Sequence, residues 1–157
     1  MYDMGVIRKA TITDLPRIID LERKCFHIDS AYSPYQLRYL ITRANSTCLI
    51  KDYQDIIQGC IIVLFRRGTG VAGIETINVH PQHRSKGIGA QLLIHAEQEM
   101  SYRRVKKIRL EVSVGNTAAI QLYQKSGFRI TTLLKGYYKN TQYGSNEAYR
   151  MVKLLTT

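Results

Sequence analysis

The segment His83–Leu93, HRSKGIGAQLL, most constrains the fold because it places two glycines where an apolar helical pattern begins. A strand-like run, residues 71–79, precedes it, so the local order is strand, loop and helix. Glycine is a poor helix former, yet Gly87 and Gly89 stand at the expected helix start. Glycines leave the first backbone amides of a helix open, and these amides attract anions together with the helix dipole. The segment therefore predicts a phosphate site.

The loop does not match the two commonest phosphate-binding patterns. Its spacing is neither the G-x-x-x-x-G-K-[ST] of a P-loop nor the G-x-G-x-x-G of dinucleotide-binding folds. Arg84 and Lys86 add charge-assisted hydrogen bonds for an anion. A Gly-x-Gly before a helix also occurs in plain loops, so the spacing alone leaves both interpretations open.

Apolar periodicity and turn residues predict a mixed α+β fold. The expected strands are 5–10, 46–52, 56–65, 71–79, 107–114, 128–134 and 147–155, and the expected helices are 13–26, 33–41, 87–100 and 117–126. Ser33 and Asn116 are the expected N-caps of two helices. Gly127 is expected to end the last helix. An antiparallel start followed by strand–helix–strand–helix–strand predicts a sheet that is parallel only near its centre.

Length and composition favour one domain, residues 1–157, in the cytoplasm. No apolar run reaches the ~20 residues of a membrane-spanning helix, and the N-terminus has no apolar signal core, so no membrane contact is expected. Three cysteines without paired spacing favour reduced thiols. The four histidines lack metal-ligand spacing, so no metal is expected.

The formal net charge is +11, from 23 Lys and Arg against 12 Asp and Glu. Such a surface attracts phosphorylated cofactors, ribosomal RNA or acidic proteins, and the charge alone does not choose among them. The densest basic run is RRVKKIR, Arg103–Arg109. A solvated helix end and strand start explains this run. A nucleic-acid contact is the alternative, although no aromatic residue is interleaved in the run.

Two longer segments, INVHPQHRSKGIGAQLL and LEVSVGNTAAIQLYQKSGF, resemble motifs of the GNAT superfamily of acetyl-CoA-dependent N-acetyltransferases. The pyrophosphate motif of that family, [QR]-x-x-G-x-[GA], is matched by Arg84, Gly87 and Gly89. Its downstream pattern, N-x-x-A-x-x-L-Y-x-x-x-G-F, is matched by residues 116–128. The opening residues 7–26 also resemble the first strand and helix of the family.

This resemblance implies the GNAT fold and a cofactor, acetyl-CoA. The implied fold is a mixed, mostly antiparallel sheet of about seven strands with about four helices on both faces, splayed at the cofactor site. The implied cofactor contacts are Ile77, Asn78 and Val79 for the pantetheine arm, Arg84, Ser85, Lys86, Gly87, Ile88 and Gly89 for the pyrophosphate, and Asn116 and Tyr123.

Within the superfamily, the segments LEVSVGN, LYQKSGF, GYYKN and EAYRM are most similar to ribosomal-protein-alanine and other protein N-terminal acetyltransferases. This similarity implies Glu111 as the general base and Tyr123 as the general acid. It also implies that Tyr137 and Tyr138 lie in a loop over the peptide entry. Tyr32 is a further candidate substrate contact.

The residues themselves leave the catalytic assignment open. Glu111 shares a strand face with Arg109, so it fits a solvated ion pair as well as a base. Glu75 shares strand parity with Ile77, so we expect it on the more apolar side, where its pKa would be raised, and other branches of the family carry a glutamate at this position. A strand bulge would invert that parity. Tyr123 fits a buried core position as well as an acid.

The predicted reaction is direct transfer of an acetyl group from acetyl-CoA to a primary amine, foremost the N-terminal α-amine of a protein. The amine must be neutral to attack, and an α-amine is about a tenth neutral at pH 7 whereas a lysine is below about a thousandth. Two alternatives stay open. One is an acetyltransferase for small amines such as polyamines, amino sugars or drugs, and the other is a non-catalytic CoA-sensing or RNA-binding module. A ribosome contact through the basic surface and the oligomeric state are left undecided.

Overall fold

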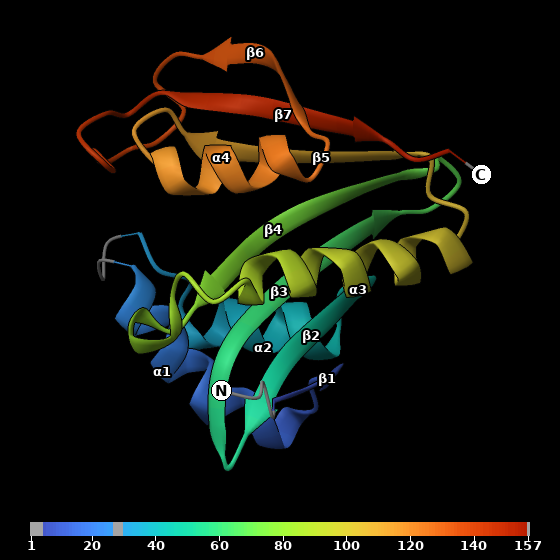
Figure 1. Cartoon of the computed structure of the whole chain (residues 1–157), viewed down its shortest axis with the longest axis vertical. Coiled ribbons are helices and arrows are strands. Elements are labelled where there is room, and N and C mark those ends of the chain that lie inside the picture. The colour runs from blue at the N-terminus through green and yellow to red at the C-terminus, as the bar shows by residue number, and fades with distance from the viewer. Residues whose placement is uncertain (1–4, 27–29, 157) are drawn as a thin grey trace.

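The computed structural model describes residues 5–26 and 30–156, which form a seven-stranded sheet with helices on both faces (Figure 1). The strands are β1 (Val6–Lys9), β2 (Ser46–Tyr53), β3 (Ile56–Arg66), β4 (Val71–Val79), β5 (Lys107–Ser113), β6 (Arg129–Leu134) and β7 (Ala148–Leu154). The helices are α1 (Leu15–Cys25), α2 (Pro34–Thr42), α3 (Ile88–Tyr102) and α4 (Thr117–Lys125), with 3-10 turns η1 (Ile12–Asp14) and η2 (Pro81–His83). The predicted α+β fold is confirmed.

The sheet has the strand order β1-β2-β3-β4-β5-β7-β6. Its neighbouring strands are antiparallel except β4 and β5, which are parallel. Only residues 71–73 of β4 pair with β5, at residues 107–109, and beyond Gly73 the two strands separate (Figure 1). The predicted splay is therefore present, and it lies at the single parallel pair.

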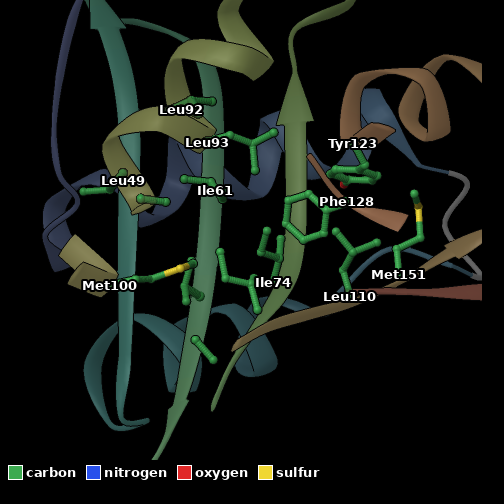
Figure 2. Close-up of a cluster of buried hydrophobic side chains, with 14 of the residues drawn as sticks. Leu49, Ile61, Ile74, Leu92, Leu93, Met100, Leu110, Tyr123, Phe128 and Met151 are labelled. Carbon is green, nitrogen blue, oxygen red and sulfur yellow. The ribbon is translucent and has the colours of Figure 1, made fainter. Parts of the chain in front are cut away.

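Two apolar clusters hold the helices on the two faces of the sheet. On one face, Leu92, Leu93 and Met100 of α3 pack in one cluster with Leu49 and Ile61 of β2 and β3 (Figure 2). On the other face, α1 and α2 pack through a cluster that includes Ile18, Leu21, Leu37, Leu40, Ile50 and Ile62. Each such side chain stabilises the fold by about 1.5–3 kcal/mol on burial. The first cluster includes Ile74 of β4 and Leu110 of β5, so it reaches the edge of the splay.

Strand β4 carries a β-bulge at Glu75. The consecutive β3 residues Ile62 and Val63 pair with Thr76 and Ile74, which leaves Glu75 as the extra residue. A bulge bends its strand and increases the local twist. This one lies two residues beyond the last β4–β5 pair, so it sits where β4 turns away from β5.

The bulge corrects the expectation for Glu75. Ile74 before the bulge and Ile77 after it both contact the α3 cluster, so the side-chain alternation inverts between them. Glu75 itself is exposed and does not lie on the apolar side. The parity count was wrong because it assumed unbroken alternation over the whole strand.

Two of the helices begin with the expected side-chain caps. Ser33 Oγ accepts the Gln36 N–H at 3.1 Å, and Asn116 Oδ1 accepts the Ala119 N–H at 3.3 Å. Gly127, with a φ of +98°, follows the last turn of α4 as predicted. Within residues 5–26 and 30–156, no helix combines the length and apolarity needed to cross a membrane.

Candidate active site

The separation of β4 from β5 opens a cavity of about 190 Å³. Its lining comes from α1, the loop before α2, both strands, α4 and the loop between β6 and β7. Its ionisable lining residues include Glu22, Tyr32, Glu75, Glu111, Tyr123 and Tyr138. Three carboxylates thus line one cavity of a protein whose net charge is +11. The described lining contains no lysine or arginine, which favours a cationic ligand.

Glu111 lies on β5 with its side chain 18% exposed. Its Oε1 accepts hydrogen bonds from Nε and Nη2 of Arg150, both at 3.1 Å, and Arg109 Nε lies 3.6 Å away. Glu111 and Arg109 share a strand face, as the alternation of β5 predicts. The ion pair orients the carboxylate at the wall of the cavity. The ion pair expected for Glu111 is therefore present, and its role as the general base stays a prediction.

Glu75 and Tyr32 meet across the mouth of the same cavity. Tyr32 Oη donates a hydrogen bond to Glu75 Oε2 at 2.8 Å. Burial raises the pKa of Tyr32 above its ordinary value, and the nearby charge of Glu75 raises it further. The phenol therefore stays protonated and remains a donor at neutral pH. The contact ties the loop before α2 to the bulge of β4.

Glu22 of α1 is a site residue that the sequence analysis missed. It is 1% exposed, and burial raises the pKa of its carboxyl, although two hydrogen bonds oppose that shift. Its Oε1 accepts the Tyr32 N–H at 3.0 Å, and its Oε2 accepts a bond from Asn78 Nδ2 at 2.5 Å. Asn78 Oδ1 in turn accepts the Thr76 hydroxyl at 3.0 Å. A continuous hydrogen-bonded network therefore links α1, the loop before α2, and β4.

One sequence signal could have revealed Glu22. It stands four residues after Ile18 and three before Cys25, within the apolar stripe of α1. A carboxylate at such a position must be buried against partners, because an unpaired buried carboxylate is costly.

The three residues predicted for the pantetheine arm are placed differently from one another. Ile77 lines the cavity. The side chain of Asn78 is buried in the network with Glu22, so only its backbone is placed to meet a ligand. The carbonyl oxygen of Val79 already accepts bonds from Cys25 Sγ at 3.4 Å and Arg84 Nε at 3.2 Å.

The N-terminus of α3 has no side-chain cap, in contrast to α2 and α4. Its N-cap residue is Gly87, whose φ of +79° lies in the left-handed region, and a Cβ there would meet no atom within 4 Å. The amides of the first helical turn, residues 88–90, have no intrahelical acceptor. Arg84 and Lys86 are exposed in the preceding loop, and Ser85 also has a positive φ, +62°. Open amides beside two cations fit a diphosphate.

The two glycines of this loop serve different purposes. Gly87 makes the left-handed turn that exposes the helix start. Gly89 is buried, and a Cβ at this position would lie 2.9 Å from Leu122 Cδ2 of α4. Gly89 therefore lies where α3 and α4 approach closely, and a larger residue there would displace the end of the Leu122 side chain. Ile88 likewise buries its side chain in the α3 cluster.

Tyr123 is both a core residue and a cavity residue. It is 5% exposed and packs edge-on against Phe128, with ring centroids 5.7 Å apart (Figure 2). Burial raises its pKa, and the nearby phenols of Tyr138 and Tyr143 add smaller contributions. The phenol therefore stays protonated at neutral pH. Asn116 lines the same cavity while it caps α4.

The loop between β6 and β7 closes one side of the cavity. The rings of Tyr137 and Tyr138 pack edge-on at 4.9 Å, with Tyr138 in the lining and Tyr137 exposed. Burial raises the pKa of Tyr138 to about 12. Ser113 Oγ at the end of β5 donates to the Gln142 carbonyl at 3.0 Å. The loop is thereby tied to β5, and its role as a peptide-entry loop stays a prediction.

The geometry defines a class of site. An uncapped helix N-terminus lies beside a splayed parallel strand pair, and carboxylates line the space between the strands. Such a site suits a phosphate-bearing ligand that meets a cationic one. The model of the acetyltransferase (GNAT) family matches residues 15–128, well over half of the chain, and the protein belongs to this family. The resemblance found in the sequence is confirmed.

Among curated proteins, the chain is 39% identical over 70 residues to the [ribosomal protein bS18]-alanine N-acetyltransferase of Escherichia coli K12. That match covers 45% of this chain and 47% of the relative. It is 28% identical over 136 residues to N-alpha-acetyltransferase 30 of Xenopus laevis, covering 82% of this chain and 46% of the relative. In both cases the match spans about half the length of the relative.

Solved structures show the same fold. The ribosomal-protein-S18-alanine N-acetyltransferase of Escherichia coli superposes with a TM-score of 0.87 at 25% identity, over 98% of this chain and 96% of that chain. Arabidopsis thaliana Naa50 in complex with the bisubstrate analogue CoA-Ac-MVNAL gives 0.83 at 24% identity, over 98% and 100%. A GNAT family acetyltransferase from Elizabethkingia anophelis with acetyl-CoA bound gives 0.80 at 23%, over 98% and 100%. The predicted GNAT fold is confirmed.

Proposed function

We propose that this protein transfers the acetyl group of acetyl-CoA to the N-terminal α-amine of a protein. The observation that carries the proposal is that the uncapped start of α3 and a carboxylate-lined cavity occupy the same splay. Membership of the acetyltransferase family supports the reaction class. The name of the bacterial relative, which acts on an alanine of a ribosomal protein, supports a protein acceptor. A cytoplasmic location stays a prediction.

Acetyl-CoA binds at two parts of the splay, with its diphosphate at the start of α3 and its pantetheine arm along β4. The amides of residues 88–90, with Arg84 and Lys86, hold the diphosphate. The backbone of β4 beyond Gly73 is not paired with β5, so its peptide groups on that side can bond the amide groups of the pantetheine arm. Ile77 offers apolar contact beside it. Acetyl-CoA supplies the thioester that makes the acetyl group transferable.

Two residues transfer protons during the reaction, Glu111 as the general base and Tyr123 as the general acid. Glu111 takes a proton from the acceptor amine, whose nitrogen forms a bond to the acetyl carbon. Tyr123 gives its proton to the sulfur as the carbon–sulfur bond breaks, and is reprotonated from solvent. The raised pKa of Tyr123 keeps that proton in place before transfer. Positioned groups of this kind accelerate proton transfer by about 10² to 10⁴.

The acceptor binds on the acidic side of the cavity. Glu75 and Tyr32 form one wall and Tyr138 another. An incoming α-ammonium is attracted by the carboxylates and loses its proton there. The same acidic lining favours a second candidate, a small polyamine, in spite of the positive net charge of the whole protein.

A thiol-release assay with acetyl-CoA tests the proposal. The acceptors are a peptide with a free N-terminal alanine, the same peptide with a blocked N-terminus, a polyamine and an amino sugar. We expect thiol release only with the free peptide, together with a mass increase of one acetyl group at its α-amine. Faster release with the polyamine would favour the second candidate. CoA binding without release by any amine would refute catalysis and support a non-catalytic CoA-binding module.

A further inference from the structure

One end of the molecule carries a cluster of exposed cations outside the proposed active site. Five of them, here called the basic end, are Arg66, Arg67, Arg104, Lys106 and Lys107. The first two lie where β3 enters its hairpin with β4. The other three lie in the connection from α3 into β5. Segments nearly forty residues apart therefore build one surface.

Backbone contacts hold these two segments together. The carbonyl oxygen of Gly70 accepts the N–H of Lys106 at 2.7 Å and that of Lys107 at 3.1 Å. Val71 then pairs with Lys107 in the parallel ladder. Because the main chain fixes the segments, the cations at the basic end are presented in a defined arrangement and not on a mobile tail.

The charges of the basic end are not balanced by neighbouring acids. Among the described residues, no ion pair involves any of the five. The adjacent Arg103 shows the contrast, because its guanidinium lies 4.1 Å from the Phe65 ring centroid and 3.4 Å from Glu99. Arg103 is therefore a structural residue. The five neighbouring cations keep a concentrated positive field that attracts a polyanion.

A hollow and an aromatic side chain accompany the charge. A cavity of about 180 Å³ lies between the segments, lined by Phe65, Arg66, Arg67 and Arg103 among others. Tyr102, the last residue of α3, is 87% exposed directly before this basic run. Exposed aromatic rings beside a positive groove are the elements that bind unpaired nucleotides by stacking. The basic run itself contains no aromatic residue, and the adjacent exposed Tyr102 is the aromatic side chain available for stacking.

The basic end and the proposed cofactor turn lie at opposite ends of α3 (Figure 1). A helix of 15 residues is about 22 Å long. A large partner can therefore occupy the basic end without covering the cavity between β4 and β5.

We propose that the basic end docks the phosphate backbone of RNA. Arginine and lysine together match this partner, since arginine binds phosphate in a bidentate manner and each neutralised phosphate releases counterions. The choice of RNA over other polyanions rests on the proposed function, because a protein acceptor from the ribosome is found next to RNA. Docking there would bring the enzyme to its acceptor while the cavity stays open.

Fluorescence anisotropy with a labelled 20-base-pair RNA duplex carrying a single-stranded overhang tests this proposal between 50 and 200 mM salt. Five phosphate contacts predict a slope of log K against log salt of about −4. The variants R66Q/R67Q and K106Q/K107Q are each expected to reduce the steepness of the slope by about 2 and to weaken binding by tenfold or more. The matched control K125Q/R129Q removes the same two charges from α4 and β6 and is expected to change binding by less than about threefold.

Three results would overturn the docking proposal. They are an equal loss in K125Q/R129Q, no salt dependence in the wild type, or competition by polyglutamate as strong as that by unlabelled RNA, which would indicate an acidic protein partner. Thermal melting checks that all variants are folded. Acetylation of a free peptide is expected to be unchanged in the basic-end variants. RNA binding by a protein that acetylates no amine would support the docking surface and refute the proposed function, so the two failures are distinguishable.

Discussion

The turn before α3 and the cavity beside β4 lie on two sides of one splay, and they are suited to opposite charges. The turn offers open amides with Arg84 and Lys86 beside them. The cavity offers carboxylates, with Glu75 and Glu111 in its lining. The net charge of +11 agrees in sign with the charged groups at the turn and is opposite in sign to the carboxylates that line the cavity. Local geometry, and not overall charge, decides which ligand each half favours.

The turn before α3, here called the anion half of the splay, and the cavity, here called its acidic half, also use different chemical groups. The anion half relies on main-chain amides, so it depends on the absence of side chains at the turn. The acidic half relies on carboxylates that are held by side-chain hydrogen bonds. We therefore expect added side chains to damage cofactor binding, and we expect carboxylate-to-amide changes to damage acceptor binding or the chemical step.

Glu111→Gln should have the largest effect. Loss of the base is expected to lower kcat by about 10³, within the range of general base catalysis, with the Kd for CoA unchanged. Steady-state kinetics between pH 6 and 9 and a CoA titration measure both quantities. Glu147→Gln, which changes a carboxylate outside the cavity lining, is the matched control. Wild-type rates for Glu111→Gln across this pH range would remove Glu111 from the mechanism.

Tyr123→Phe tests the proton donor proposed in the cavity. The substitution keeps the edge-on contact with Phe128, so the melting temperature should change little. Loss of the proton donor is expected to lower kcat by about 10² without changing the Kd for CoA. A near-normal kcat would show that Tyr123 serves the core alone.

Glu75→Gln should produce a smaller and different effect. Removal of one cavity charge is expected to raise the KM for the amine by about tenfold, which corresponds to about 1.4 kcal/mol. We expect kcat to stay within about twofold. If kcat instead falls as far as in Glu111→Gln, Glu75 is the base and the assignment of the two carboxylates must be exchanged.

Glu22→Gln should have the smallest effect, and the effect should be seen in how the free energy of unfolding depends on pH. Burial raises the folded-state pKa of Glu22, so the folded protein binds more protons than the unfolded one between the two pKa values. Its contribution to stability is therefore complete below the unfolded pKa, about 4.3, and is lost as pH rises through the raised value. Urea unfolding from pH 4 to 8 is expected to show this loss in the wild type and not in the variant, with at most about 1.4 kcal/mol per pH unit. A difference in the free energy of unfolding between the wild type and the variant that stays constant with pH would contradict this account.

Much of the fold could be predicted because its signals are local. The alternation of β5 placed Glu111 beside Arg109, and the residue types at Ser33 and Asn116 marked their helix starts. The separation of β4 from β5 came from the family resemblance, and it is confirmed by pairing that ends at Gly73.

The remaining features depend on tertiary contacts that a single sequence does not display. The bulge at Glu75 is defined only by its pairing with β3. The close contact of Gly89 with Leu122 forms only when α3 and α4 pack together. Glu22 acquires its partners, Tyr32 and Asn78, only when α1 packs on the sheet. Of these residues, Glu22, Tyr32 and Glu75 also line the cavity.

The central claim is that bare amides at the start of α3 hold the diphosphate of CoA, and Gly87 tests it most directly. Gly87→Asp places a negative charge at the turn, and Gly87→Asn adds a side chain of the same size without charge; both residues tolerate a left-handed φ. CoA titration by calorimetry is expected to give an affinity about 100-fold weaker for Gly87→Asp and less than about tenfold weaker for Gly87→Asn, with both proteins folded. Equal affinities for the wild type and Gly87→Asp would show that the diphosphate binds elsewhere.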